Sequence, residues 1–218
     1  MIAKSSQPII ILGAGGHAKV VTDVLVKSGY EIIGIVTPDK ERDSLCFGYR
    51  VIGDDDELDS YRDKDFLLAN GIGFLPGKSL RWDIAMKMRE KGHSFVNVIH
   101  PSAIIADDVT LVEGVQVMAG SIIQPGVHIG RDTIINTGAC IDHDCNIGKN
   151  CHFAPGVTLS GDVQVDDGVH IGTGSSVIQG KTIGTGTVIA AASVIYHDIP
   201  DNVTYIQSRQ ETIELNRN

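Results

Sequence analysis

Residues 139 to 177 read ACIDHDCNIGKNCHFAPGVTLSGDVQVDDGVHIGTGSSV, and a large apolar residue recurs at every sixth position. The period holds over residues 97 to 197, where every sixth residue from Ile99 to Ile195 is apolar. A small or β-branched residue, such as Ala139 or Cys145, precedes most of these positions by two. A period of six fits neither an α-helix nor a flat strand, so the chain must turn a corner every six residues. Hexapeptide repeats of this kind predict a parallel β-helix, with about eighteen residues in each three-sided coil.

The N-terminal part has the pattern of a strand, a glycine turn and a helix. The apolar run PIIIL at residues 8–12 ends in GAGGHA at 13–18, and an amphipathic segment then continues to Gly29. A second strand is expected from Glu31 to Val36, which completes a parallel βαβ unit. Too few residues precede the repeat for a complete dinucleotide-binding fold, which needs two such halves. We therefore expect half a Rossmann fold that binds a mononucleotide or a nucleotide-sugar, with phosphate at the glycine turn.

Further elements follow from the same kind of pattern. Strands are expected at 49–52 and 66–70, a helix at about 78–91, and a last strand at 203–206, after the repeat ends at Ile195. The predicted domains are residues 1–96, a Rossmann-like nucleotide-sugar-binding domain, and residues 97–218, a β-helix with a C-terminal tail. The fold class is therefore α/β followed by β.

Composition narrows the possible partners. The net charge of −9 argues against a nucleic-acid backbone or an anionic membrane as the main partner. No run of eighteen apolar residues and no signal peptide is present, so we expect a cytoplasmic protein. The cysteines show no CxxC spacing and are expected to be reduced core residues. They are Cys46, Cys140, Cys145 and Cys151.

His143 lies between two carboxylates, Asp142 and Asp144, directly after an inward-facing aliphatic residue. It should therefore project from a corner or side of the β-helix. An imidazole oriented by a carboxylate is suited to act as a general base near neutral pH. The alternative is a solvated polar turn without a catalytic role.

His152 follows nine residues later, which is half a coil, so the side chains of His143 and His152 should leave opposite sides of the β-helix. They can meet only across an interface between neighbouring chains, and a three-sided prism packs naturally as a homotrimer. The remaining histidines outside the glycine turn are interpreted as ordinary surface or turn residues. They are His93, His100, His128, His170 and His197.

The order of the motifs resembles one family. GAGGHAKV at 13–20, followed by NTGACIDHDCNIGKNCHFAPGVTLSG at 136–161, is similar to the sialic-acid O-acetyltransferase and bacillosamine-pathway N-acetyltransferase family. The resemblance covers almost the whole chain. It implies a left-handed β-helix and transfer of an acetyl group from acetyl-CoA to the amine of a nucleotide-activated amino-sugar. A UDP-4-amino-4,6-dideoxy sugar used in glycan biosynthesis is the substrate that the resemblance favours.

The resemblance also implies residue roles. His143 matches the family's general base, Asp144 the acidic residue that orients it, and His152 the histidine that contacts the thioester region of acetyl-CoA. The expected sugar-nucleotide residues are Gly15, Gly16, His17 and Asn136, and the expected pantetheine-lining residues are Gly161, Thr173 and Ala191. The family often has aspartates after the second strand, where this chain has VTPDK at 36–40, so recognition of the base is not carried over.

We expect direct transfer through a ternary complex, without a metal and without a covalent cysteine intermediate. O-acetylation of a sialic acid or a related sugar hydroxyl is the alternative within the same class. A zinc enzyme with His128, His143 and His152 as ligands is a second alternative. A third is a non-catalytic binding module whose N-terminal domain senses a nucleotide.

Overall fold

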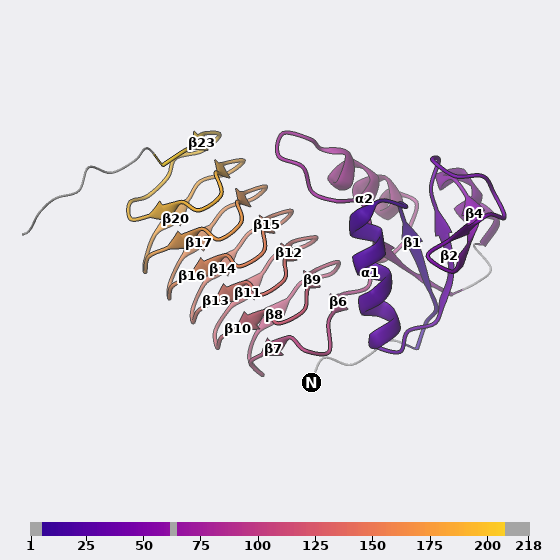
Figure 1. Ribbon diagram of the computed structural model, residues 1–218, viewed down its shortest axis with the longest axis horizontal. Coiled ribbons are helices and arrows are strands. Elements are labelled where there is room, and N and C mark those ends of the chain that lie inside the picture. Colours follow the sequence, from indigo (N-terminus) through magenta and orange to yellow (C-terminus); the bar gives the residue numbers. More distant parts are fainter. Residues whose placement is uncertain (1–5, 62–64, 208–218) are drawn as a thin grey trace, which may run out of the picture.

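The computed structural model describes residues 6–61 and 65–207 (Figure 1). An α/β unit lies at one end of a three-sided β-helix, whose coils stack along the long axis of the molecule. Residues 208–218, in the tail of the predicted second domain, lie outside the described residues.

The α/β unit is built on a five-stranded sheet with the order β3-β4-β2-β1-β5. Its elements are β1 (Ile9–Leu12), α1 (Gly16–Lys27), β2 (Ile32–Val36), β3 (Leu45–Cys46), β4 (Tyr49–Gly53), the 3-10 helix η1 (Asp55–Tyr61), β5 (Leu67–Asn70) and α2 (Leu80–Glu90). Strands β1, β2, β4 and β5 are parallel, and only β3 runs antiparallel to its neighbour β4. The predicted βαβ unit is present as β1, α1 and β2.

Both faces of this sheet are covered, which explains why β1 is apolar at every position. Ile9 and Ile11 pack toward α1, whereas Ile10 and Leu12 pack toward α2 and η1. Alternate residues of a strand point to opposite faces, so a central strand with helices on both sides must be apolar throughout. All four side chains of β1 are buried.

The β-helix begins at β6 (Val98–Ile99) and consists of strands of two residues. Its other strands are β7 (Ile104–Ile105), β8 (Thr110–Leu111), β9 (Gln116–Val117), β10 (Ile122–Ile123), β11 (His128–Ile129), β12 (Ile134–Ile135), β13 (Cys140–Ile141), β14 (Asn146–Ile147), β15 (His152–Phe153), β16 (Thr158–Leu159), β17 (Gln164–Val165), β18 (His170–Ile171), β19 (Ser176–Val177), β20 (Thr182–Ile183), β21 (Val188–Ile189), β22 (Val194–Ile195) and β23 (Thr204–Tyr205). They form three parallel sheets, which we call the β13, β14 and β15 sheets after one strand of each. Their orders are β22-β19-β16-β13-β10-β7, β20-β17-β14-β11-β8 and β23-β21-β18-β15-β12-β9-β6.

The interior of the prism confirms the hexapeptide pattern. The second residue of each strand points inward, and from β9 to β22 these side chains are almost completely buried. The small residues two positions earlier, such as Ala139 and Cys145, are also buried in the same core. The corners therefore close tightly, because a larger side chain in this slot would overpack the turn.

The prism continues for two segments beyond the predicted end of the repeat. β23 pairs with β21 through Thr204 and Val188, and Ile199 forms a bridge with Ile183. In each of these two pairs, the paired residues are sixteen positions apart in the sequence. In the preceding coils the paired residues are eighteen positions apart, as His152 and His170 are. The last strand was predicted at 203–206, but a corner shortened by two residues hides from a search for a strict period of six that these segments continue the prism.

The α/β unit packs on the first strands of the β15 sheet. Val21 and Leu25 of α1 share one buried cluster with Val98 of β6 and Ile134 of β12. The Ser28 hydroxyl, just after α1, donates a 2.9 Å hydrogen bond to the carbonyl of Ile99. The sheet face that carries the first coils is therefore buried against the α/β unit.

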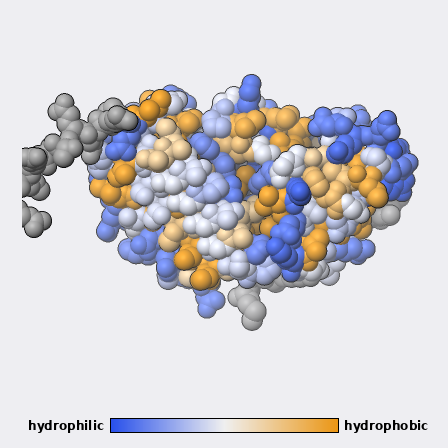
Figure 2. Space-filling model, viewed as in Figure 1, coloured by the Kyte–Doolittle hydropathy of each residue, from blue (hydrophilic) through white to orange (hydrophobic). Residues whose placement is uncertain are grey.

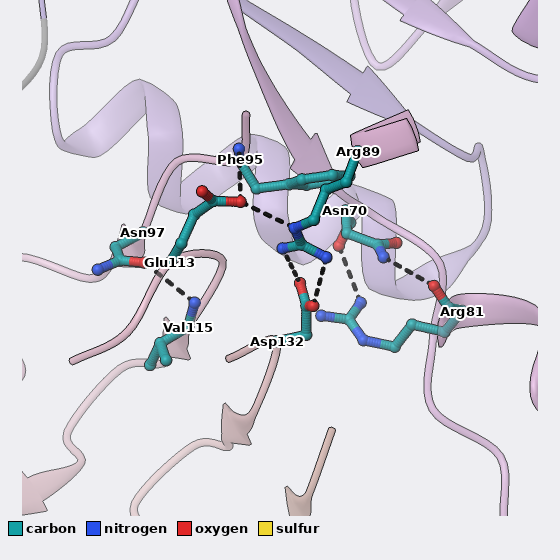
Figure 3. Close-up of polar contacts among 8 residues, drawn as sticks. All are labelled: Asn70, Arg81, Arg89, Phe95, Asn97, Glu113, Val115 and Asp132. Carbon is teal, nitrogen blue, oxygen red and sulfur yellow. Dashed lines mark hydrogen bonds and ion pairs between the residues drawn. The ribbon is translucent and has the colours of Figure 1, made fainter. Parts of the chain in front are cut away.

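A buried ion-pair network joins α2 to two corners of the prism (Figure 3). Arg89 forms a bidentate pair with Asp132, at 2.7 and 2.9 Å, and also donates to Glu113 at 2.9 Å. The Asp132 carboxylate is 1% exposed and the Arg89 side chain 13% exposed. Glu113 also accepts the backbone N–H of Phe95, and Asp132 lies in the left-handed region with φ of 60°.

The rest of the visible surface is mixed in character. Figure 2 shows one face of the molecule, on which hydrophobic and hydrophilic residues are interspersed. Within residues 6–61 and 65–207, no helix is both long enough and apolar enough to cross a membrane.

Replacing Asp132 with Asn should destabilise the protein by about 3–5 kcal/mol, because Arg89 would lose its buried bidentate partner and keep only the more exposed Glu113. Asn tolerates positive φ, so the substitution tests the charge rather than the backbone. Urea unfolding is the measurement. Asp167→Asn, which breaks the exposed pair with Lys149, is the control and should change stability by no more than about 1 kcal/mol. Equal effects of the two substitutions would contradict the proposed importance of the buried pair.

Candidate functional site

A cavity of about 800 Å³ lies at the carboxyl ends of the strands of the α/β unit. Its walls include the glycine turn after β1, the segments after β2, β4 and β5, and one side of α2. Parallel α/β sheets bind ligands at this edge, where the loops after the strands come together. The cavity is large enough for a nucleotide-sized ligand.

The glycine turn presents the N-terminus of α1 to this cavity. Gly15 is the N-cap residue, and no side chain caps the first turn, so the first amides of α1 remain available for an acceptor. Gly15, Gly16 and His17 all line the cavity. Gly71 lets this turn approach β5, because a Cβ there would lie 2.7 Å from the Leu12 carbonyl oxygen.

Arg81 lies in the wall of the cavity and is 3% exposed. Its Nη1 donates to the carbonyls of Asn70 and Ile72, at 3.0 and 2.6 Å. Its Nε and Nη2 atoms are buried and make no hydrogen bond with a described residue. Burial lowers the pKa of Arg81 to about 10, so the guanidinium still carries its charge at neutral pH.

His17 joins the glycine turn to the prism, which sequence reasoning missed. Its Nε2 lies 2.7 Å from Oε1 of Gln116 on β9, and Nε2 of Gln116 donates to the Asn70 carbonyl. The amide of Gln116 is therefore oriented, and His17 must carry its proton on Nε2. Burial, together with the smaller effect of the nearby Arg81 charge, lowers the pKa of His17 to about 4. This imidazole is neutral at physiological pH.

His143 occupies an open corner between the β13 and β14 sheets. Its Nδ1 lies 2.8 Å from Oδ2 of Asp144, and its side chain is 51% exposed. The hydrogen bond to Asp144 is the main cause that raises the pKa of His143, and the nearby charge of Asp142 adds to it. Because Nδ1–H donates to the carboxylate, the lone pair of the neutral ring is on Nε2.

Gly161 lies one coil beyond His143 and directly beside its ring. A Cβ on Gly161 would lie 2.5 Å from both Cε1 and Nε2 of His143. The φ of Gly161 is not in the left-handed region, so the space for the imidazole, rather than backbone strain, is what demands glycine here. The sequence suggested Gly161 as a pantetheine-lining residue and did not predict this contact.

His152 belongs to a different group on the outer face of the β15 sheet. Its Nε2 lies 3.1 Å from Nδ2 of Asn136, and its Nδ1 lies 3.1 Å from Nδ1 of His170. Phe74 covers both imidazoles, with ring centroids 5.3 Å from His152 and 5.5 Å from His170. The interpretation of His170 as an ordinary surface residue is wrong, because it is half-buried within this group. The spacing of eighteen residues between His152 and His170 equals one coil, and this spacing in the sequence predicts that the two histidines lie side by side on neighbouring strands.

Within one chain, the expected site residues therefore lie in separate places. His143 and Gly161 share the corners between the β13 and β14 sheets, opposite the β15 sheet that carries His152. Thr173 and Ala191 lie at the corners between the β15 and β13 sheets. The Ala192 N–H donates to the Thr173 carbonyl there. The opposite placement of His143 and His152 agrees with the nine-residue offset in the sequence.

The candidate zinc ligands do not converge within one chain. His128 lies on the β14 sheet, His143 at a corner and His152 on the β15 sheet. No three histidine, cysteine or acidic side chains gather as a metal site in the described parts of the chain.

Two family models match the chain. The PglD N-terminal domain matches residues 8–88, and the bacterial transferase hexapeptide model of six repeats matches residues 127–161. An α/β unit with this cavity, followed by hexapeptide coils, defines the class of left-handed β-helix acyltransferases.

The perosamine N-acetyltransferase of Caulobacter crescentus, solved with CoA and GDP-perosamine, is 40% identical, with a TM-score of 0.84 over 92% of this chain and 93% of that chain. The acetyltransferase domain of PglB from Neisseria gonorrhoeae, solved with acetyl coenzyme A, is 31% identical, with a TM-score of 0.83 over 92% of this chain and 96% of that chain. The chain therefore belongs to the hexapeptide-repeat sugar acetyltransferases, a family of enzymes that use acetyl-CoA.

Among curated relatives, an acyl-[acyl-carrier-protein]–UDP-N-acetylglucosamine O-acyltransferase of Aliivibrio fischeri is 33% identical over 100 residues. The match covers 45% of this chain and 38% of that enzyme, so the chain spans well under half the length of this relative.

Replacing Gly161 with Ala should lower kcat by about 10²-fold, because a displacement of the His143 ring by about 1 Å is enough to disrupt its alignment. Steady-state acetyl-transfer kinetics are the measurement, and the melting temperature should stay near that of the native protein. Ser160→Ala, at the adjacent position, is the control and should keep its activity. An active Gly161→Ala enzyme would show that the contact with His143 is unimportant.

Proposed function

We propose that this protein transfers the acetyl group of acetyl-CoA to the amine of a nucleotide-activated amino-sugar, with His143 as general base. The observation that carries this proposal is the hydrogen bond between His143 Nδ1 and Asp144 at an exposed corner. It leaves the Nε2 lone pair free to accept a proton and gives the imidazolium that forms a carboxylate partner.

The reaction is a direct attack of the amine on the thioester carbonyl. His143 accepts a proton from the nitrogen as the new C–N bond forms, and the tetrahedral intermediate expels the CoA thiolate as the C–S bond breaks. The backbone N–H of Gly161 makes no hydrogen bond with a described residue and lies beside the His143 ring, so it is suited to donate to the oxyanion.

The cysteines of the prism do not favour a covalent route. Burial raises the pKa of Cys145 to about 11 and that of Cys151 to about 12, and it also raises the pKa of Cys140. These thiols stay protonated at neutral pH, and the thiolate is the nucleophilic form. This supports direct transfer rather than an acetyl-cysteine intermediate.

The cavity of the α/β unit is the proposed site of the nucleotide. The free amides at the N-terminus of α1 and the buried charge of Arg81 suit a diphosphate. Two acidic residues, Asp39 and Asp54, line the cavity after β2 and β4. A carboxylate pairs well with the adjacent N1–H and amino group of guanine, whereas uracil offers one N–H between two carbonyls. We therefore favour a GDP-sugar over the UDP-sugar suggested by the resemblance.

We further propose that the active unit is a homotrimer. His143 and His152 leave opposite sides of the prism, so a site that uses both histidines needs one from each of two chains. Closed threefold packing of three-sided prisms would create three equivalent sites.

Acetyl transfer to 4-amino sugars carried on GDP, UDP and CMP should be fastest with GDP, because guanine matches the carboxylates of the cavity. Thiol release from acetyl-CoA gives the rate. In the same assay, His143→Ala should lower kcat by about 10² to 10⁴. Binding of CoA to this variant, measured by calorimetry, should persist. Preference for a sialic acid would support the O-acetylation alternative. Undiminished turnover by His143→Ala would exclude this residue as the base.

Asp144→Asn should shift the acidic limb of the pH profile of kcat/KM to lower pH. Asp144 raises the pKa of His143, so the base form of native His143 is lost as pH falls through this raised value. Asn at this positive φ keeps the turn but lowers the pKa toward that of an ordinary histidine, about 6.5. The maximal rate should also fall, because the ring loses its orientation. An acidic limb that does not move would show that another group controls it.

Mixing His143→Ala with His152→Ala subunits should restore part of the activity that each variant lacks alone. A mixed trimer contains at least one site with both histidines intact, if each site takes them from two chains. The variants would be refolded together at equal concentration and assayed, with formation of mixed trimers checked by mass spectrometry. Mixed trimers without activity would refute the shared site.

A further inference from the structure

His152 and His170 form a pair on the outer face of the β15 sheet, next to the proposed nucleotide-sugar site. They occupy equivalent positions of β15 and β18. The Phe74 ring stacks on His170 at an interplanar angle of 8°. Phe74 belongs to the segment after β5 whose residues Gly73 and Leu75 line the cavity. The pair is therefore covered by the same segment that forms the wall of that cavity.

The hydrogen bonds that link Asn136, His152 and His170 all donate in the same direction, from Asn136 toward His170. Oδ1 of Asn136 accepts the backbone N–H of Thr137 at 2.8 Å, which orients the amide. Nδ2 of Asn136 must therefore donate to Nε2 of His152. With Nε2 as acceptor, neutral His152 carries its proton on Nδ1 and donates it to Nδ1 of His170. His170 in turn carries its proton on Nε2.

Both rings are neutral at physiological pH, as this direction requires. Burial, together with the smaller effects of the neighbouring His170 and His17, lowers the pKa of His152 to about 3. Burial also lowers the pKa of His170. Both ring nitrogens of His152 are used inside the protein, whereas Nε2–H of His170 makes no hydrogen bond with a described residue. The free donor of the pair belongs to His170.

We propose that His170 binds substrate by donating its Nε2–H to an oxygen of the sugar moiety, and that His152 and Asn136 are positioning residues that fix this tautomer. This inference rests on the proposed function, because it takes the ligand of the adjoining cavity to be a nucleotide-sugar. The family resemblance gave His152 a contact with the thioester. In this proposal the residue that contacts a ligand is instead His170, one coil further along. The sugar is favoured over the thioester because Phe74 and the cavity lie in the same chain as the pair.

Two substitutions separate the roles of the two nitrogens of His170. In His170→Asn, the short amide oxygen replaces Nδ1 as acceptor for His152 but nothing replaces Nε2–H. In His170→Gln, the longer amide reaches the position of Nε2 as donor but leaves the Nδ1–H of His152 without an acceptor. His128→Asn, on the exposed face of the β14 sheet, is the matched control.

The measurement is calorimetric affinity for the best nucleotide 4-amino-sugar and for its nucleoside diphosphate alone. The dissociation constant of the nucleoside diphosphate divided by that of the nucleotide-sugar isolates the contribution of the sugar. His170→Asn should reduce this ratio about tenfold, the value of one lost hydrogen bond, and leave the affinities for the nucleoside diphosphate and CoA unchanged. His170→Gln should reduce it less, and His128→Asn should not change it.

Nitrogen-15 NMR of the imidazoles gives an independent readout. The native protein should show His152 protonated on Nδ1 and His170 on Nε2 across neutral pH, and His170→Asn should preserve the His152 tautomer. A His152 ring protonated on Nε2, or an unchanged sugar contribution in His170→Asn, would overturn the inference. Loss of acetyl-CoA affinity instead would assign the donor to the thioester. If no nucleotide-sugar binds the native protein, the proposed function fails as well.

Discussion

The buried pair between Arg89 and Asp132 fixes the position of the α/β unit on the prism. Asp132 lies at a corner of the β-helix and Arg89 at the end of α2, so the pair joins the two parts of the chain directly. Desolvating two charges is expensive, and only good geometry and further hydrogen bonds offset the cost. The bidentate contact and the bond to Glu113 meet this requirement. The same arrangement holds Phe74 over the histidine pair, because Phe74 belongs to the segment that leads into α2.

The prism determines where chemistry is possible. Its sides are flat sheets of two-residue strands, so functional side chains project either from a side, as His152 does, or from a corner, as His143 does. A corner on one edge and the opposite side cannot face each other within one chain. This constraint separates the proposed base from the proposed sugar-binding residues and is the physical reason for proposing a site shared between subunits.

Burial gives the histidines different roles. His143 is exposed beside a carboxylate, so its pKa is raised and it can exchange a proton near neutral pH. His17 and His152 are partly buried without a carboxylate partner, so they stay neutral and serve as fixed hydrogen-bonding groups. Chemically identical side chains are thus suited to act as a base or as positioning groups, depending on their surroundings.

The sequence by itself determined the prism, the βαβ unit and the opposite placement of His143 and His152, because these follow from strictly local periodicity. The Asp144 partner of His143 was also readable, since the two residues are adjacent. Only the tertiary structure decided the Arg89–Asp132 pair, the bond of His17 to Gln116 and the cover of Phe74 over His170. These contacts join residues far apart in the chain, and no local period records such distances. The shortened last corner could not be predicted from the sequence for a related reason. It lacks two residues, so the period of six is broken there, although the pairing of the strands continues.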